Sequence, residues 1–153
     1  MSKKAPVTEE VEPEAEVMSI KGNGSFIFPD GSKYTGDYVD TGGTKVREGD
    51  GLYIFGAESY KGGWANDQMS GKGKYKFASG NIYDGKFANG MFEGQGQYTF
   101  SDGATYVGSW KQNNMHGNGE YTDTNNVKWN GTFFNGMYDT GKSYISLRPI
   151  IGL

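Results

Sequence analysis

The chain has 153 residues; 26 are glycine and four proline, and it holds eleven tyrosines, nine phenylalanines, three tryptophans, one histidine and no cysteine. This composition excludes collagen, a wholly disordered chain and any disulfide or thiolate-metal framework. The net charge of −3 arises from residues 1–18, which hold two lysines and five glutamates. The neutral remainder gives no electrostatic reason to bind DNA, RNA or anionic lipid.

The first predicted element is a disordered acidic arm over residues 1–18. Its lysines, glutamates, prolines, alanines and valines, without aromatic residues, are typical of disorder. The alternative is an extended arm that orders against a partner. The chain shows no apolar run near 18 residues and no signal-like segment, so we expect a soluble intracellular protein.

Residues 19–137 carry five copies of one pattern. Gly-x-Gly pairs begin at Gly22, Gly49, Gly71, Gly94 and Gly117, and their spacing settles at 23 residues. An aromatic-x-Gly element keeps the same phase, and a second ring follows two residues after its glycine. The rings at these two positions are Tyr34, Tyr38, Tyr60, Trp64, Tyr83, Phe87, Tyr106, Trp110, Trp129 and Phe133. A fixed period of this length indicates a repeat protein.

Each copy is predicted to form a β-hairpin. In residues 72–77 the rings of Tyr75 and Phe77 alternate with lysines, which is the period-two pattern of a half-buried strand. Residues 82–87 form the returning strand, and Asn89-Gly90 favours a turn with positive φ.

The glycines in these strands are expected to leave gaps that neighbouring rings cover. The longer first spacing is assigned to a loop around residues 42–45, which is rich in turn formers. Stacked hairpins share a core that a single hairpin lacks. The predicted fold is therefore all-β, with tandem antiparallel hairpins stacked into an elongated, curved, single-layer sheet.

Residues 138–153 depart from the pattern and include the most aliphatic stretch of the chain. Repeat arrays need an atypical terminal element to cover an exposed edge. This segment is either a cap folded back on the last hairpin or a tail that docks into a partner.

The repeat resembles the membrane occupation and recognition nexus (MORN) repeat. In the fullest copy, Tyr106-x-Gly-x-Trp110 leads to His116-Gly-x-Gly119, and the other copies replace the histidine with Glu48, Ser70 and Glu93. The resemblance covers residues 22–137 and implies stacked hairpins that form a rod or groove. Residues 119–131 are also similar to the end of a short mammalian member of the family. MORN arrays occur in radial spoke heads and other axonemal structures, in junctional membrane proteins and in parasite cytoskeletal rings.

No catalytic residue, metal site or cofactor is predicted. His116 is the single histidine, occupies a repeat position and lacks a nucleophile-elbow sequence nearby. A strand is expected after each Gly-x-Gly pair, whereas a phosphate-binding loop needs a helix there. The residues outside the repeats are too few for a catalytic domain, so we expect a protein that is not an enzyme.

The ten rings of the repeat pattern are the predicted partner-binding surface. A single-layer sheet has no opposing layer to cover them, and an exposed apolar groove usually marks a partner site. We expect a peptide strand or helix of a protein partner in the concave groove, and no nucleic acid. By analogy with the family, the setting is the cytoskeleton, in the axoneme of a cilium or flagellum, for example at a radial spoke. The alternative is a peripheral membrane tether whose repeats bind phospholipid.

Overall fold

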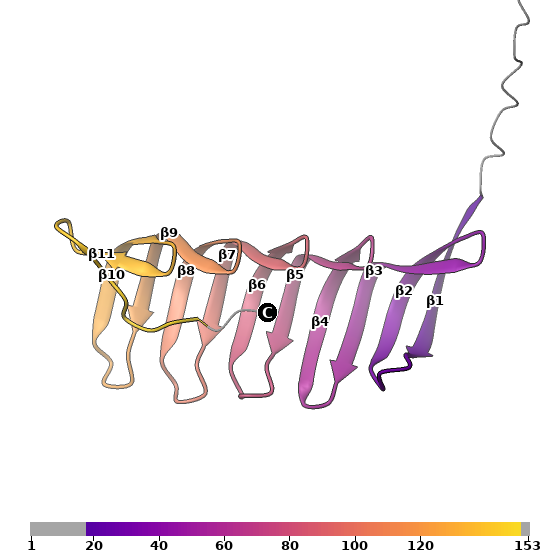
Figure 1. The fold of residues 1–153 in the computed structure, drawn as a ribbon, viewed down its shortest axis with the longest axis horizontal. Helices are drawn as coiled ribbons and strands as arrows, with labels where there is room; N and C mark the ends of the chain where they lie inside the picture. The colour runs from indigo at the N-terminus through magenta and orange to yellow at the C-terminus, as the bar shows by residue number, and fades with distance from the viewer. Residues whose placement is uncertain (1–17, 151–153) are drawn as a thin grey trace, which may run out of the picture.

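The computed structural model describes residues 18–150, which form one open sheet of twelve antiparallel strands arranged in chain order (Figure 1). The strands are β1 (Ser19–Ile27), β2 (Lys33–Thr41), β3 (Thr44–Phe55), β4 (Glu58–Ala65), β5 (Gln68–Lys76), β6 (Ile82–Ala88), β7 (Met91–Thr99), β8 (Thr105–Lys111), β9 (Asn114–Thr122), β10 (Lys128–Phe134), β11 (Met137–Asp139) and β12 (Tyr144–Ile145). The predicted all-β, single-layer hairpin array is confirmed. The acidic arm lies, up to residue 17, outside the described residues. Within residues 18–150 no helix is long and apolar enough to cross a membrane.

Five of the hairpin turns are two-residue turns in which both φ angles are positive. Such turns match the right-handed twist of the flanking strands. They are Gly42-Gly43, Asn66-Asp67, Asn89-Gly90, Gln112-Asn113 and Asn135-Gly136. The turn lies within the loop predicted around residues 42–45 but is shorter, because β2 and β3 continue to Thr41 and Thr44 and leave only the two glycines as the turn. The extra residues behind the longer first spacing therefore lie in the β2–β3 hairpin, which is longer than the others.

Four of the five repeats bend where their pairing register shifts. On β8 and β9 the shift lies between Gly108 and Trp110, and β9 contributes Gly117 there with a φ of 82°. Equivalent shifts occur between β2 and β3, β4 and β5, and β6 and β7. Bulges of this kind kink a strand and increase its twist. Each of these hairpins consequently has two arms at an angle, which Figure 1 shows as hairpins that turn partway along their length.

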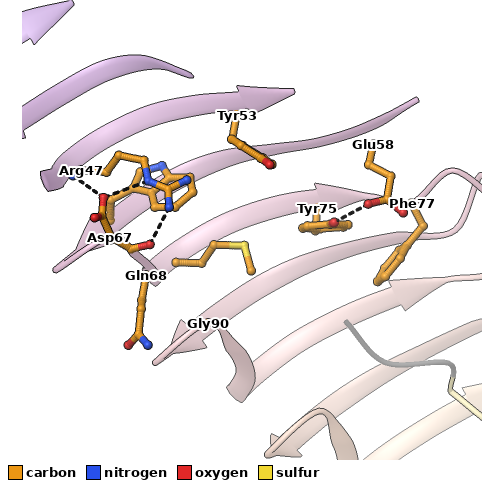
Figure 2. Close-up of a pocket in the computed structure, with 10 residues that line it drawn as sticks. Arg47, Tyr53, Glu58, Asp67, Gln68, Tyr75, Phe77 and Gly90 are labelled. Atoms are coloured by element: carbon orange, nitrogen blue, oxygen red, sulfur yellow. Dashed lines mark hydrogen bonds and ion pairs between the residues drawn. The ribbon is translucent and has the colours of Figure 1, made fainter. Parts of the chain in front are cut away.

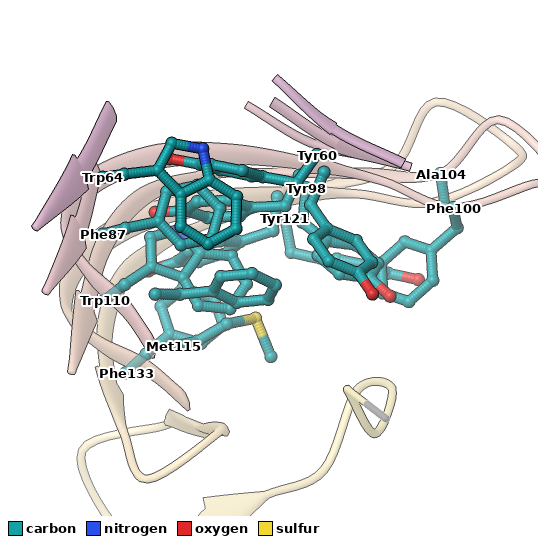
Figure 3. Packing of buried hydrophobic residues seen from close by; sticks show 14 of the residues in the cluster. Tyr60, Trp64, Phe87, Tyr98, Phe100, Ala104, Trp110, Met115, Tyr121 and Phe133 are labelled. Carbon is teal, nitrogen blue, oxygen red and sulfur yellow. The ribbon is translucent and has the colours of Figure 1, made fainter. Parts of the chain in front are cut away.

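The core fills the concave angle between the two arms (Figure 3). Eight rings from successive repeats alternate there in an edge-to-face row that we call the ring stack. In order of contact its members are Tyr34, Trp64, Tyr60, Phe87, Tyr83, Trp110, Tyr106 and Phe133. Each tyrosine comes from one arm and each tryptophan or phenylalanine from the other. Edge-to-face pairs add about 0.5–1.5 kcal/mol beyond the area they bury, so the ring stack joins one repeat to the next.

The strand glycines make room for these rings, as predicted. The ring of Tyr83 lies against Gly96, where any added Cβ would come within 3.0 Å of ring atoms. A Cβ on the facing Gly85 would lie 2.5 Å from the Cα of Gly96. A side chain at either position would therefore force the two strands apart or lift the tyrosine out of the core.

Candidate partner-binding groove

The structure corrects the accessibility that we expected for the repeat rings. Eight of the ten predicted partner-binding residues are buried within the chain, and these eight are the members of the ring stack. The prediction assumes that a single sheet has no opposing layer. The bend supplies that layer, because the two arms of each hairpin face one another across the rings. These residues hold the array together and offer little surface to a partner.

Tyr38 and Trp129 are the two predicted rings that remain half-exposed. Tyr38 packs edge-to-face against Phe26 at the N-terminal end, with ring centroids 5.3 Å apart. Trp129 packs against Tyr121 at the other end, with centroids 5.8 Å apart. Both stand at the ends of the array, so contact with a partner stays a prediction for them.

The hydroxyl groups of the four tyrosines in the ring stack donate hydrogen bonds to backbone carbonyl oxygens within the chain. Tyr83 donates a hydrogen bond to the carbonyl oxygen of Lys86 at 2.8 Å, and Tyr106 donates to that of Ser109 at 2.9 Å. Tyr34 and Tyr60 make the equivalent bonds. The accepting carbonyls lie at the bend, where the strand ladder is interrupted. Burial raises the pKa of Tyr34 and of Tyr60 to about 12, so these side chains stay neutral at physiological pH.

A second row of aromatic residues lies beside the ring stack on the longer strand of each repeat. Its members are Tyr53, Tyr75, Tyr98 and Tyr121, and in three repeats a phenylalanine follows two residues later, at the end of the strand or just beyond it: Phe55, Phe77 and Phe100. Tyr98 and Phe100 are buried, whereas Tyr53 and Phe77 are only half-buried. The concave face is therefore more open over the earlier repeats than over the later ones.

That opening is a cleft of about 460 Å³ (Figure 2). Its apolar lining comes from Tyr53, Trp64, Met69, Tyr75 and Phe77, and its polar lining from Arg47, Glu58, Asp67 and Gln68. We call this hollow the open cleft. It differs from the predicted surface in using the second row and only one member of the ring stack, Trp64.

Two polar interactions frame the open cleft. At one end, Arg47 Nε lies 3.1 Å from Asp67 Oδ1 and its guanidinium carbon lies 4.1 Å from the ring centroid of Trp64. At the other end, the Tyr75 hydroxyl donates to Glu58 Oε2 at 2.9 Å. Burial and this hydrogen bond raise the pKa of Tyr75. No sequence pattern points to Glu58, because its place in the repeat is held elsewhere by serine, asparagine, alanine or valine.

Over the later repeats the chain covers its own groove. After β12 the segment 146–150 turns back across the concave face, and Leu147 and Ile150 pack against the core. Between them, Arg148 Nη1 lies 2.6 Å from Asp102 Oδ2, and its guanidinium carbon lies 4.1 Å from the ring centroid of Phe100. The hydrogen bond from Arg148 lowers the pKa of Asp102. We call residues 146–150 the tail segment.

Neighbouring repeats are also joined along the turns. Glu93 Oε2 accepts a hydrogen bond from the backbone amide of Gln112, and Glu48 Oε2 accepts one from that of Asn66. Both glutamates occupy the position that is histidine in the fullest copy. The sequence marked them only as departures from the family pattern, whereas the structure shows that each holds the turn of the following repeat.

His116, the single histidine of the chain, lies on β9. The His116 ring packs against Phe134 with centroids 5.3 Å apart. No group of histidine, cysteine or carboxylate side chains in that part of the chain is placed to hold a metal ion.

A bent, single-layer array of stacked hairpins with a ring-filled concave face defines an open β-repeat protein. The chain belongs to the MORN repeat family, since the family model matches residues 20–33, 60–82, 83–105 and 106–128. The unmatched stretch 34–59 contains the lengthened β2–β3 hairpin, which interrupts the 23-residue spacing. A search of curated proteins finds no significant match to the chain. Membership is consistent with a scaffold or membrane-binding repeat protein, in a family that is generally non-enzymatic.

Proposed function

We propose that the chain is a non-enzymatic scaffold that binds protein partners along its concave face, at the open cleft. The observation that carries the proposal is the cleft itself, an apolar hollow framed by Arg47 and Glu58 that the tail segment leaves uncovered. Half-buried Tyr53, Met69 and Phe77 supply the apolar surface. Aromatic anchors inside a polar rim are typical of protein interfaces.

The shape of the groove favours an extended segment of the partner. The concave face runs along the array, and the tyrosines of the second row follow one another along it at intervals of 22 or 23 residues. A peptide lying along this row would meet Tyr53, Tyr75 and Phe77 in turn, with its polar groups toward the rim. This is recognition of a linear segment by an elongated groove.

The partner site is tested by placing a charge in the cleft. Tyr53→Arg should reduce partner recovery in quantitative affinity purification by about tenfold or more, because it introduces an ion into an apolar contact. Val107→Arg is the matched control, since Val107 is exposed on the outer face of β8. Both variants should keep the wild-type circular dichroism spectrum. Equal partner recovery by the two variants would contradict the proposal.

The proposed setting is a cytoskeletal assembly in the axoneme of a cilium or flagellum, such as a radial spoke. It is supported by analogy with other MORN arrays. A fluorescently tagged chain should stay on demembranated axonemes after detergent extraction. Complete release with the soluble fraction would exclude this setting.

The second candidate function, a peripheral membrane tether, is favoured by a basic patch on the outer face. Lys61 pairs across the strands with Lys74, and Lys72 with Lys86. Like charges at such positions repel one another, and an anionic surface would relieve the repulsion. Of these four lysines, which all lie in the described part of the chain, only Lys74 has an ion pair, with Asp84 at 3.1 Å.

Liposome flotation separates the two functions. If the chain is a tether, it should float with vesicles containing phosphatidylserine at low salt, and a Lys72→Gln, Lys86→Gln double variant should not. Lys111→Gln is the control for charge away from the patch. If the chain is a scaffold that binds protein alone, wild type and both variants should remain with the unbound fraction.

A further inference from the structure

The tail segment shows what kind of peptide this groove accepts. Leu147 and Ile150 place aliphatic side chains against the aromatic core, and Arg148 lies between them on the face of Phe100. The guanidinium group also meets the carboxylate of Asp102. The concave face thus already binds one extended segment, through two aliphatic contacts and one arginine that is held by a ring and a carboxylate.

The position of the Asp102 carboxylate determines where along the groove the tail segment binds. Asp102 is in the turn between β7 and β8, and the corresponding residue one repeat earlier is Ser79. Phe77 replaces Phe100 in the earlier repeat, so the apolar part of the site recurs there. Of these two repeats, only the later one offers Arg148 both a ring and an acid in this arrangement; the same pair recurs in the first repeat as Phe28 and Asp30.

The open cleft presents the same chemistry with its acid at a different position. Phe77 and Tyr75 correspond to Phe100 and Tyr98, and Glu58 stands beside them. Within residues 18–150, no lysine or arginine lies within ion-pair distance of Glu58, whereas Asp67 at the other end is paired with Arg47.

The cleft also contains an arginine on a ring, with the geometry seen in the tail segment. Arg47 lies 4.1 Å from the centroid of Trp64, and Arg148 lies 4.1 Å from that of Phe100. Guanidinium groups stack on aromatic faces and bind carboxylates in a planar fork. The groove therefore holds two arginine side chains, Arg47 and Arg148, each on an aromatic ring. The carboxylate of Glu58 is available to bind a third arginine.

We propose that the open cleft binds an extended peptide of a protein partner that carries an arginine between two aliphatic residues. The arginine binds Glu58, and the aliphatic residues lie on Met69 and Phe77. This inference rests on the proposed scaffold function and specifies the chemistry of the partner. The tail segment is its internal counterpart, seated on the neighbouring part of the same groove.

The probe is a synthetic peptide with blocked ends and the sequence of residues 145–150, titrated into the full chain. The three tryptophans give separate indole signals in ¹⁵N NMR spectra, and Trp64 lines the cleft whereas Trp129 lies at the far end of the array. The peptide should shift the Trp64 signal saturably and leave that of Trp129 in place. The methyl signal of Ile150 should also stay unchanged; its displacement would show that the peptide had replaced the tail segment and would overturn the proposal.

Two substitutions test the role of the charge. Glu58→Gln keeps an acceptor for Tyr75, and it should weaken peptide binding about tenfold through loss of one charge-assisted contact. A peptide with glutamine in place of its arginine should bind the wild type equally weakly. Asp84→Asn removes the same charge from the outer face and should leave binding unchanged. Undiminished binding to the Glu58→Gln chain would overturn the proposal.

Other outcomes separate this inference from the scaffold function. If Tyr53→Arg abolishes partner recovery but the peptide does not bind, the cleft is the partner site and the arginine chemistry is wrong. If sedimentation shows a dimer that Glu58→Gln dissociates, the occupant is a second copy of the chain, which also overturns the proposal.

Discussion

The rings of Tyr83 and Trp110 stand at 87° to one another with their centroids 5.2 Å apart, although they belong to successive repeats. Trp110 makes a second edge-to-face contact with Tyr106 of its own repeat, at 5.1 Å. Its indole nitrogen donates to the carbonyl oxygen of Gly96 at 3.1 Å. One side chain thus joins two repeats through two rings and a backbone hydrogen bond.

Trp110→Ala should lower the free energy of unfolding by about 3–5 kcal/mol, because it leaves a large cavity in the middle of the ring stack. Urea titration followed by circular dichroism measures the change. Trp110→Phe should cost much less, since phenylalanine occupies this position as Phe87 and Phe133. Val107→Ala on the exposed face of the same strand should change stability by no more than about 0.5 kcal/mol. A loss from Trp110→Ala no larger than that control would refute the ring stack.

Gly108→Ala should destabilise the sheet by about 1–3 kcal/mol through overpacking. Its new Cβ would lie 2.5 Å from the Cα of Gly119 and 2.6 Å from the carbonyl oxygen of Asn118. Gly131 holds the same repeat position, but a Cβ there would meet only the Tyr138 side chain, at 3.3 Å. Gly131→Ala should therefore be tolerated. Thermal melts of the two variants compare them directly, and equal melting temperatures would contradict the close strand approach.

The buried tyrosines predict a loss of stability at alkaline pH. Burial raises the pKa of Tyr34 and Tyr60 to about 12, and that of Tyr83 and Tyr106 also rises. The folded state then holds more protons than the unfolded state above pH 10, so stability is complete below pH 10 and falls as the pH rises toward 12. Urea titrations at pH 9, 10 and 11 measure the slope.

The contribution of one tyrosine to this pH dependence is measured with a single variant. Tyr83→Phe removes one titrating hydroxyl group and should make the alkaline decline shallower, even though its stability at pH 7 is lower through loss of the bond to Lys86. An unchanged slope would mean that Tyr83 does not contribute.

The tail segment should detach when its ion pair is removed. The Ile150 methyl group packs against an aromatic core, so its proton signal should be displaced by ring currents. Asp102→Asn or Arg148→Gln should return that signal toward its random-coil position. Exposed ion pairs contribute about 0–1 kcal/mol, so the free energy of global unfolding should barely change. An unmoved methyl signal in both variants would show that the aliphatic contacts alone hold the segment.

The repeat period sufficed to predict the strands, the glycine positions and the identity of the rings that gather on one face. It did not predict that Tyr83 and Trp110 are buried. Alternation of side chains along a strand shows which face a residue lies on, but it does not show that the strand bends partway along its length. The signal for the bend was present in the Gly-x-Gly pairs. In such a pair the first glycine takes a positive φ, as Gly94 and Gly117 do. The second glycine, Gly96 or Gly119, lies under a tyrosine ring.

The candidate site was less predictable than the fold. The open cleft depends on which parts of the groove the chain itself covers, and the contact between Arg148 and Asp102 spans 46 residues that no local pattern connects. Glu58 occupies a position that varies between repeats, so the repeat period does not predict a functional residue there. Tyr53 and Phe77 belong to a second aromatic row that has the same period as the first, and only the structure shows that these two rings of the row are accessible.

Site-specific photo-cross-linking is the most direct test of the claim that partners bind in the open cleft. Benzoylphenylalanine replaces Tyr53 in the cleft or Val107 on the outer face, and the purified chain is irradiated with the partner recovered by affinity purification. The aromatic replacement keeps a ring at position 53 and adds no charge. We predict a cross-linked product from position 53 and none from position 107. Cross-linking from position 107 alone would place the partner on the outer face and contradict the account.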